Sequence, residues 1–168
     1  AEGKMSAKSR LALLAGMSLV LLSLIGCGGS FIENEISPIA SETVSVQMQY
    51  LDGAELGPLY DVEVMVPADW VNQFETRNIG NKLYFTYLAD DDVPAEIFYI
   101  EALSVSQYWD QNGPHPGSYT NIVNRGDTFF VYYLPIDSYY SGLDKTQFTV
   151  FAEKVPAIVA SFNATVAN

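Results

Sequence analysis

The stretch Tyr60-Asp-Val-Glu-Val-Met-Val66 places an apolar side chain at every second position, and three of those four side chains are valines. Such alternation of β-branched residues predicts a strand with one buried face. The stretch Val44-Ser-Val-Gln-Met-Gln-Tyr50 alternates in the same way and predicts a second strand. Residues 51–58 between them are rich in glycine and end in Pro58, which is the composition of a turn.

Further strands are expected along the chain. Residues 76–79 and 82–88 flank Gly80-Asn81, a pair typical of a two-residue hairpin turn. A strand is also expected at residues 96–103, and short helical turns at 68–74 and 106–111. Residues 119–123 and 128–134 are expected to form a further hairpin around the turn Asn124-Arg-Gly-Asp127. The run 129–134 is apolar on both sides, which favours a strand covered on both faces.

The end of the chain has a different period. Apolar residues recur there at the spacing of one helix face, namely Phe148, Phe151, Val155, Ile158, Val159 and Phe162. Pro156 must kink this helix or split it after Val155. The sequence therefore predicts an α+β fold, with an antiparallel sheet of about six or seven strands and a long C-terminal helix packed on one face.

The composition favours one folded domain without nucleic-acid partners. The 168 residues are 49% hydrophobic and 17% charged, enough apolar material for a core. Residues 27–168 carry a formal net charge of −14, because the first 26 residues hold +2 of the total of −12. So acidic a surface repels phosphate backbones. The single cysteine, Cys27, rules out an intrachain disulfide.

The N-terminal segment has the features of a signal peptide. Basic Lys8-Ser9-Arg10 precedes residues 11–25, an apolar stretch without any charge. As a helix these 15 residues would span about 22 Å, less than the ~30 Å hydrocarbon core of a bilayer. That length is typical of a signal peptide rather than of a membrane span.

The stretch ends in Leu24-Ile25-Gly26-Cys27, which resembles the bacterial lipobox. The resemblance implies that residues 1–26 are removed and that Cys27 carries a diacylglyceryl group with acyl chains such as palmitate. Two or three chains hold a protein durably on a membrane. We then expect residues 27–43 to be a lipidated tether and 44–168 to be an extracytoplasmic domain. The domain would lie at the outer face of the cytoplasmic membrane or at an outer membrane. The alternative is an uncleaved signal anchor with Cys27 as a buried thiol.

A second resemblance concerns the domain. Val66-Pro-Ala-Asp-Trp70, the middle hairpins and the closing Val155-Pro-Ala-Ile-Val-Ala-Ser-Phe162 look like small bacterial lipoproteins of the PsbP-like α+β fold. Those proteins generally serve as accessory or assembly factors of membrane complexes. The resemblance brings no catalytic residues with it.

Aromatic residues are the main candidates for an interaction surface. The chain has 11 tyrosines, and Tyr108, Trp109, Tyr139 and Tyr140 are candidate contact residues. Exposed tyrosine and tryptophan favour protein or glycan contacts. Tyrosines half-buried in a sheet are the alternative interpretation.

Other polar residues carry weaker signals. His115 is the only histidine and lacks the partners of a zinc or nucleophile system. Asp90-Asp91-Asp92 lacks the spacing of a calcium loop. Glu101 and Asp110 would suit acid–base chemistry only if they lay together. We therefore expect no metal, no cofactor and no catalytic set.

These observations lead to three functional hypotheses. The favoured one is a non-enzymatic accessory or interaction subunit of a membrane or envelope complex, held by lipid on Cys27. The alternative is a ligand-binding module for a small molecule, a glycan or a cation. A hydrolase that relies on carboxylates alone is the third.

Overall fold

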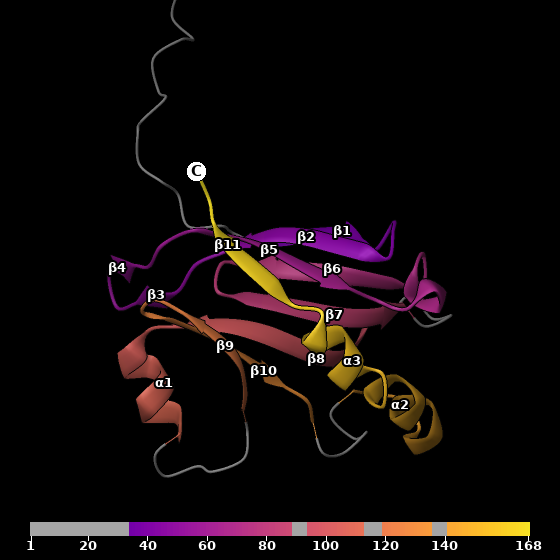
Figure 1. Ribbon diagram of the computed structural model, residues 1–168. Coiled ribbons are helices and arrows are strands. Elements are labelled where there is room, and N and C mark those ends of the chain that lie inside the picture. The colour runs from indigo at the N-terminus through magenta and orange to yellow at the C-terminus, as the bar shows by residue number, and fades with distance from the viewer. Residues whose placement is uncertain (1–33, 89–93, 113–118, 136–140) are drawn as a thin grey trace, which may run out of the picture. The chain divides into compact units, whose positions relative to one another are not determined.

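The computed structural model describes residues 34–88, 94–112, 119–135 and 141–168, all within one compact unit, Phe31–Asn168. These residues form eleven strands in three antiparallel sheets, with three short α-helices and one 3-10 turn (Figure 1). The expected α+β fold is therefore wrong, because strands dominate and a second sheet, not a long helix, covers the main sheet.

The large sheet has six strands. Its spatial order is β1 (Glu35–Pro38), β6 (Phe74–Ile79), β7 (Lys82–Leu88), β8 (Pro94–Leu103), β10 (Thr128–Tyr133) and β9 (Thr120–Arg125). Gly80 and Gly126 have φ angles of 55° in the turns of two hairpins, a backbone region that favours glycine. The expected hairpins around Gly80-Asn81 and Gly126-Asp127 are confirmed.

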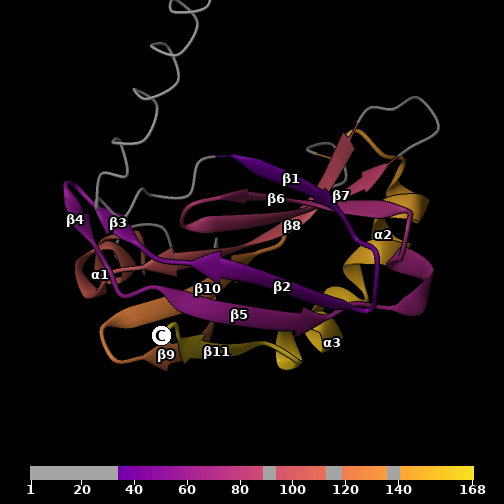
Figure 2. The same ribbon diagram turned by 90° about the horizontal axis from the view of Figure 1, so that it is seen from above.

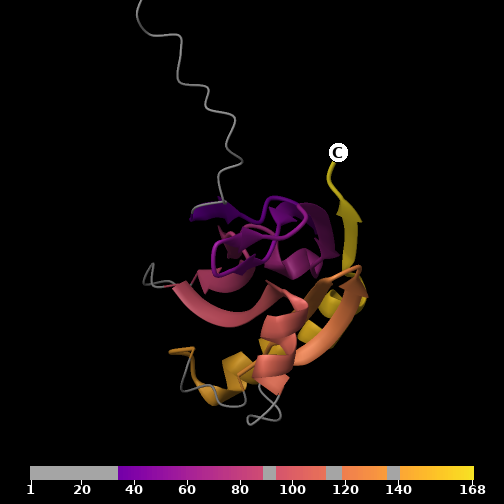
Figure 3. The ribbon, with the colours of Figure 1, turned by 90° about the vertical axis from the view of Figure 1, so that its left-hand side faces the viewer.

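The small sheet has the order β11 (Asn163–Val166), β5 (Tyr60–Met65) and β2 (Thr43–Met48). A short hairpin of β3 (Leu51–Asp52) and β4 (Glu55–Leu56) connects β2 to β5. Seen from above, β2 and β5 run over the large sheet (Figure 2), and Figure 3 shows the large sheet curving around the small one. We call the face of the large sheet toward the small sheet its inner face and the opposite one its outer face.

The core lies between the two sheets. Alternation buries Tyr60, Val62 and Val64 of β5 and leaves Asp61 and Glu63 exposed. Across the gap the ring of Tyr60 meets that of Phe130 edge-on, with centroids 5.3 Å apart. The inner face of the large sheet contributes mostly large side chains, including Phe74, Leu83, Phe85, Phe98, Ile100 and Phe130.

The prediction of one long C-terminal helix is wrong, because the helix is divided in two. The chain forms α2 (Lys145–Ala152) and α3 (Val155–Ala160), and the segment after α3 becomes β11. Pro156 lies in the first turn of α3, where its missing N–H costs nothing, whereas in a continuous helix its ring would clash with the carbonyl of Ala152. The apolar side chains Phe148, Val155 and Ile158 still reach the core, but from two helices.

The remaining helices are short. The 3-10 turn η1 (Ala68–Trp70) buries Trp70, which stacks on Phe74 with centroids 3.9 Å apart. Helix α1 (Val105–Asn112) covers part of the outer face of the large sheet, where Tyr108 stacks on Phe129. None of the described helices is long and apolar enough to cross a bilayer.

Candidate functional site

A row of side chains crosses the outer face of the large sheet. Tyr84 of β7 is the register partner of Tyr99 in β8, and Tyr99 is the partner of Tyr133 in β10. On the other side Tyr84 pairs with Arg77 of β6, which pairs with Ile36 of β1. Register partners point to the same face, so five adjacent strands contribute one side chain each. We call this set, together with Tyr119, the aromatic row.

The tyrosine rings contact each other along the row. The centroids of Tyr84 and Tyr99 lie 5.0 Å apart, and those of Tyr99 and Tyr133 lie 5.3 Å apart. Tyr119, which directly precedes β9, adds a fourth ring 5.8 Å from that of Tyr133. Its hydroxyl oxygen is 3.0 Å from that of Tyr99, so the two hydroxyls share a hydrogen bond. All four rings are half-buried and therefore both supported and accessible.

Two cations lie over the rings. The guanidinium carbon of Arg77 is 4.7 Å from the centroid of Tyr84, and the ammonium of Lys82 is 5.2 Å from that of Tyr99. Both distances fall within the range of cation–π attraction. The Nε of Arg77 is buried and has no hydrogen-bond partner among the described residues. The row therefore combines flat apolar area with fixed positive charge.

A buried carboxylate lies beside the row. Glu101 of β8 is 4% exposed, and its Oε1 accepts a hydrogen bond of 3.2 Å from Asn81 Nδ2 and lies 3.9 Å from Lys82 Nζ. Its Oε2 has no partner among the described residues. Burial raises the pKa of Glu101, and the nearby Lys82 and Asn81 only partly oppose that shift.

Within the row, the ionisation of Tyr99 is suppressed. Burial, together with the hydrogen bond to Tyr119, raises the pKa of the Tyr99 hydroxyl well above its ordinary value. Burial also raises the pKa of Glu96, one row away, against the opposing charges of Arg77 and Lys82. A neutral Tyr99 hydroxyl donates and accepts hydrogen bonds but is a poor base. The arrangement is suited to recognition.

Two of the four interaction residues expected from the sequence lie in the part of the chain that the structure describes. Tyr108 and Trp109 lie on α1, where Tyr108 stacks on Phe129 with centroids 4.2 Å apart. Trp109 is 64% exposed and meets Tyr108 edge-on. Tyr139 and Tyr140 lie outside the described residues. Trp109 is therefore exposed to solvent, whereas Tyr108 packs against the sheet.

Several other candidates also fall outside the described residues, namely Cys27, Asp90, Asp91, Asp92 and His115. Glu101 is buried in β8 with its carboxylate on Asn81 and Lys82, whereas Asp110 is an exposed residue of α1. Over residues 34–88, 94–112, 119–135 and 141–168, no three histidine, cysteine or acidic side chains gather as metal ligands.

Sequence reasoning missed most of the aromatic row, although part of it follows from one turn. A two-residue turn at Gly80-Asn81 pairs Ile79 with Lys82, and therefore Arg77 with Tyr84. The next pairing, of Tyr84 with Tyr99, lies beyond a register shift at Phe85/Thr86 and the undescribed segment 89–93. No local pattern predicts such a pairing.

Comparison of the chain with protein-family models, with curated proteins and with solved structures found no match. The resemblances to the lipobox and to PsbP-like lipoproteins therefore rest on the quoted residues alone.

Proposed function

We propose that this protein is a membrane-anchored, extracytoplasmic lipoprotein without enzymatic activity, whose domain binds a protein subunit of a membrane or envelope complex through the aromatic row. The anchor in this proposal is lipid on Cys27, supported by Leu24-Ile25-Gly26-Cys27 after a basic and an apolar segment. The binding surface is supported by the geometry of the outer face.

The observation that carries the binding proposal is the alignment of Tyr84, Tyr99 and Tyr133 as register partners, with Arg77 over the first ring. Tyrosine and arginine are enriched where a few residues dominate the binding energy of protein interfaces. Rings fixed by sheet pairing lose little conformational entropy when a partner covers them. The row thus offers preorganised apolar area with donors at its edge.

The position of β1 supports a domain held close to the membrane. The segment expected to be a tether ends in strand, because β1 begins at Glu35. Only residues 28–34 then separate Cys27 from the sheet, and these seven residues reach at most about 25 Å when fully extended. A partner within the same membrane would lie within that reach.

A glycan is the second candidate ligand of the row. Sugar rings present an apolar face and a rim of hydroxyls, and the flat tyrosine rings with the Tyr99–Tyr119 hydroxyl pair offer both kinds of contact. Binding of soluble glycans to the wild type and to the tyrosine double variant described next distinguishes this alternative from a protein partner.

The proposed test compares cross-linking in native membranes between wild type and the double variant Tyr84→Ser/Tyr133→Ser. We expect one reproducible cross-linked protein that is lost in the variant. The matched control is Met65→Ser, which removes an exposed apolar side chain, 56% accessible, from the outside of the small sheet. Mass spectrometry of the N-terminal peptide reports the lipid on Cys27.

The outcomes are distinct. A cross-linked partner that persists in the tyrosine variant, or one lost equally in the Met65 control, would remove the aromatic row from the proposal. An unmodified Cys27 in membranes would remove the lipid anchor. Binding of soluble glycans that depends on the row, without any protein partner, would favour the second candidate.

A further inference from the structure

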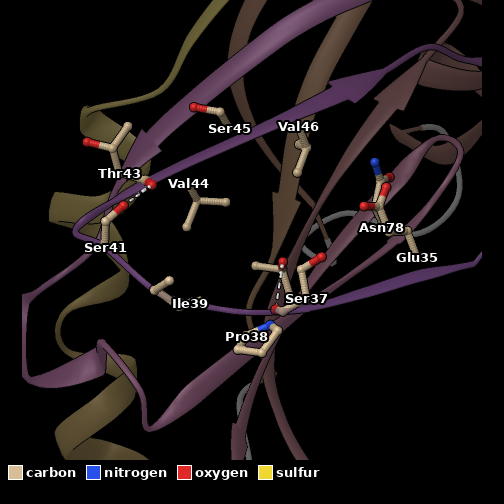
Figure 4. A pocket seen from close by; sticks show the side chains of 12 residues that line it. Glu35, Ser37, Pro38, Ile39, Ser41, Thr43, Val44, Ser45, Val46 and Asn78 are labelled. Carbon is tan, nitrogen blue, oxygen red and sulfur yellow. Dashed lines mark hydrogen bonds between the residues drawn. The ribbon is translucent and has the colours of Figure 1, made fainter.

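The two sheets leave a groove at their open edge, between β1 and β2 (Figure 4). It has a volume of about 330 Å³ and a mixed lining. Ile39 and Val44 form its apolar floor, whereas Ser37, Ser45, Glu35 and Asn78 contribute polar groups. We call this feature the edge groove. It lies between the sheets, at the edge of the large sheet opposite β9, and the aromatic row lies on the outer face.

Asn78 is the residue that marks the edge groove as a binding site. It is 3% exposed, and its side-chain Nδ2 donates a hydrogen bond of 2.9 Å to the backbone carbonyl of Gln47. This bond fixes the orientation of the amide, and its Oδ1 has no partner among the described residues. Figure 4 shows Asn78 beside Glu35 at one end of the groove. A buried acceptor without a donor is costly, so a donor supplied by a ligand would be favoured.

The free edge of β2 supplies backbone groups in the same groove. Val44 and Val46 are paired with β5, and the alternation of an antiparallel ladder turns Thr43, Ser45 and Gln47 to the other side. The carbonyl of Thr43 accepts from the Ser41 hydroxyl, and that of Gln47 accepts from Asn78. Ser45 lies between these two capped positions, and no described residue caps its N–H or C=O on the free edge. Free backbone groups on a strand edge can pair with an added strand.

The charge of the lining indicates what kind of strand would bind. Glu35 lines the edge groove, and Asp61 and Glu63 line the hollow that continues along β2 and β5. Among the residues that the structure describes, no lysine, arginine or histidine lines either one. Positive side chains on the ligand would therefore be attracted and negative ones repelled.

We propose that the edge groove binds an extended, basic peptide segment by strand addition to β2. One ligand residue lies opposite Ser45 and exchanges both backbone hydrogen bonds with it. A neighbouring ligand N–H donates to Oδ1 of Asn78, and a lysine or arginine side chain of the ligand extends to Glu35. This site goes beyond the proposed function, because it uses neither the aromatic row nor the lipid anchor.

The test uses the full chain in detergent micelles and a fluorescein-labelled hexapeptide, Lys-Val-Lys-Val-Lys-Val, with Glu-Val-Glu-Val-Glu-Val as its opposite-charge counterpart. We expect saturable binding of the basic peptide alone, with amide shifts in NMR spectra that centre on Ser45. The variant Ser45→Pro removes the free-edge N–H without removing a β2–β5 ladder bond, since proline is tolerated on that side of an edge strand. It should weaken binding about tenfold, whereas Ser45→Ala should not.

Two further variants examine the polar groups. Glu35 is exposed, so Glu35→Gln should weaken binding of the basic peptide while leaving folding unchanged. Asn78→Ser should also weaken binding, with the thermal unfolding midpoint reporting whether the fold persists. Equal affinity for both peptides, equal affinity of Ser45→Pro and Ser45→Ala, or shifts centred on the tyrosines would each overturn the proposal. Shifts at Ser45 that grow with protein concentration in the absence of peptide would assign the groove to a second copy instead.

Discussion

The hydroxyl oxygens of Tyr99 and Tyr119 lie 3.0 Å apart, which ties the segment before β9 to the middle of the large sheet. Tyr99 lies two strands away from β9, because β10 separates them in the sheet. The bond therefore bridges over β10 on the outer face and helps to fix the fourth ring of the aromatic row.

Replacing either tyrosine of this pair with phenylalanine should reduce the free energy of unfolding by about 0.5–1.5 kcal/mol, the net contribution of a typical hydrogen bond. The double variant Tyr99→Phe/Tyr119→Phe should cost little more than one single variant, since each hydroxyl has lost its partner already. Urea denaturation of the four proteins gives the coupling. Fully additive costs would show that the hydroxyls do not interact.

The buried carboxylate of Glu101 should make stability depend on pH. Burial raises its folded-state pKa above the ordinary 4.5. At low pH Glu101 is therefore protonated in both the folded and the unfolded protein and does not change the free energy of unfolding. As the pH rises past 4.5 the unfolded state ionises first, and stability is lost until the folded-state pKa is passed. A tenfold difference in proton affinity between the folded and unfolded states corresponds to about 1.4 kcal/mol of this loss.

The variant Glu101→Gln lacks this ionisation. Its free energy of unfolding, relative to wild type, should therefore increase with pH between about pH 4 and the raised pKa. Glu63→Gln, at an exposed carboxylate, controls for the change in net charge. Denaturation curves at several pH values give the comparison, and parallel pH profiles for wild type and Glu101→Gln would contradict the expectation.

Helix α2 begins with a side-chain cap that sequence reasoning did not use. Asp144 Oδ1 accepts from the backbone N–H groups of Thr146 and Gln147, at 2.9 and 3.0 Å. Asp144→Ala should cost about 0.5–2 kcal/mol, whereas Asp144→Ser keeps a capping oxygen and should cost less. A thermal-unfolding series tests this, and equal losses in both variants would argue against capping as the cause.

The strands were predictable wherever one face alone is buried. Alternation in 60–66 and 44–50 located β5 and β2 to within two residues at each end, because one side of the small sheet faces solvent. The turn residues at Gly80 and Gly126 located two hairpins, since a positive φ strongly favours glycine there. Each of these predictions needs only a short window of sequence, so it does not depend on knowledge of the fold.

The third strand of the small sheet, β11, was not predictable in the same way. Residues 163–166 are only four residues long and hold one buried side chain, Ala164, so β11 has no clear period. The apolar spacing from Phe148 to Phe162 fits a helix face because both α2 and α3 contribute to it, although α2 ends at Ala152 and Pro156 lies in the first turn of α3. The pairing of Tyr84 with Tyr99 depends on long-range register, which no short window of sequence contains.

The neighbouring ring of Tyr50 leaves no room for a side chain at Gly57. A Cβ added at this position would lie 2.4 Å from Cε1 of Tyr50, which is 7% exposed and cannot move without disturbing the core. Gly57→Ala should therefore cost about 1–3 kcal/mol, the usual penalty of overpacking. In a Tyr50→Leu background the same substitution should cost much less, because the shorter side chain lacks that atom. Equal costs in the two backgrounds, measured by urea denaturation, would show that the ring is not responsible.

The strand order of the small sheet has a consequence for the timing of folding. Its middle strand, β5, pairs with β11, and the partners Glu63 and Asn163 are 100 residues apart in the chain. Contacts over so long a separation close slowly, because the loop entropy must be lost before the pairing compensates for it. The small sheet therefore stays incomplete until residue 166 is available. A chain that crosses a membrane from its N-terminus would keep this edge of β5 unpaired, and open to chaperones or proteases, until the last strand had emerged.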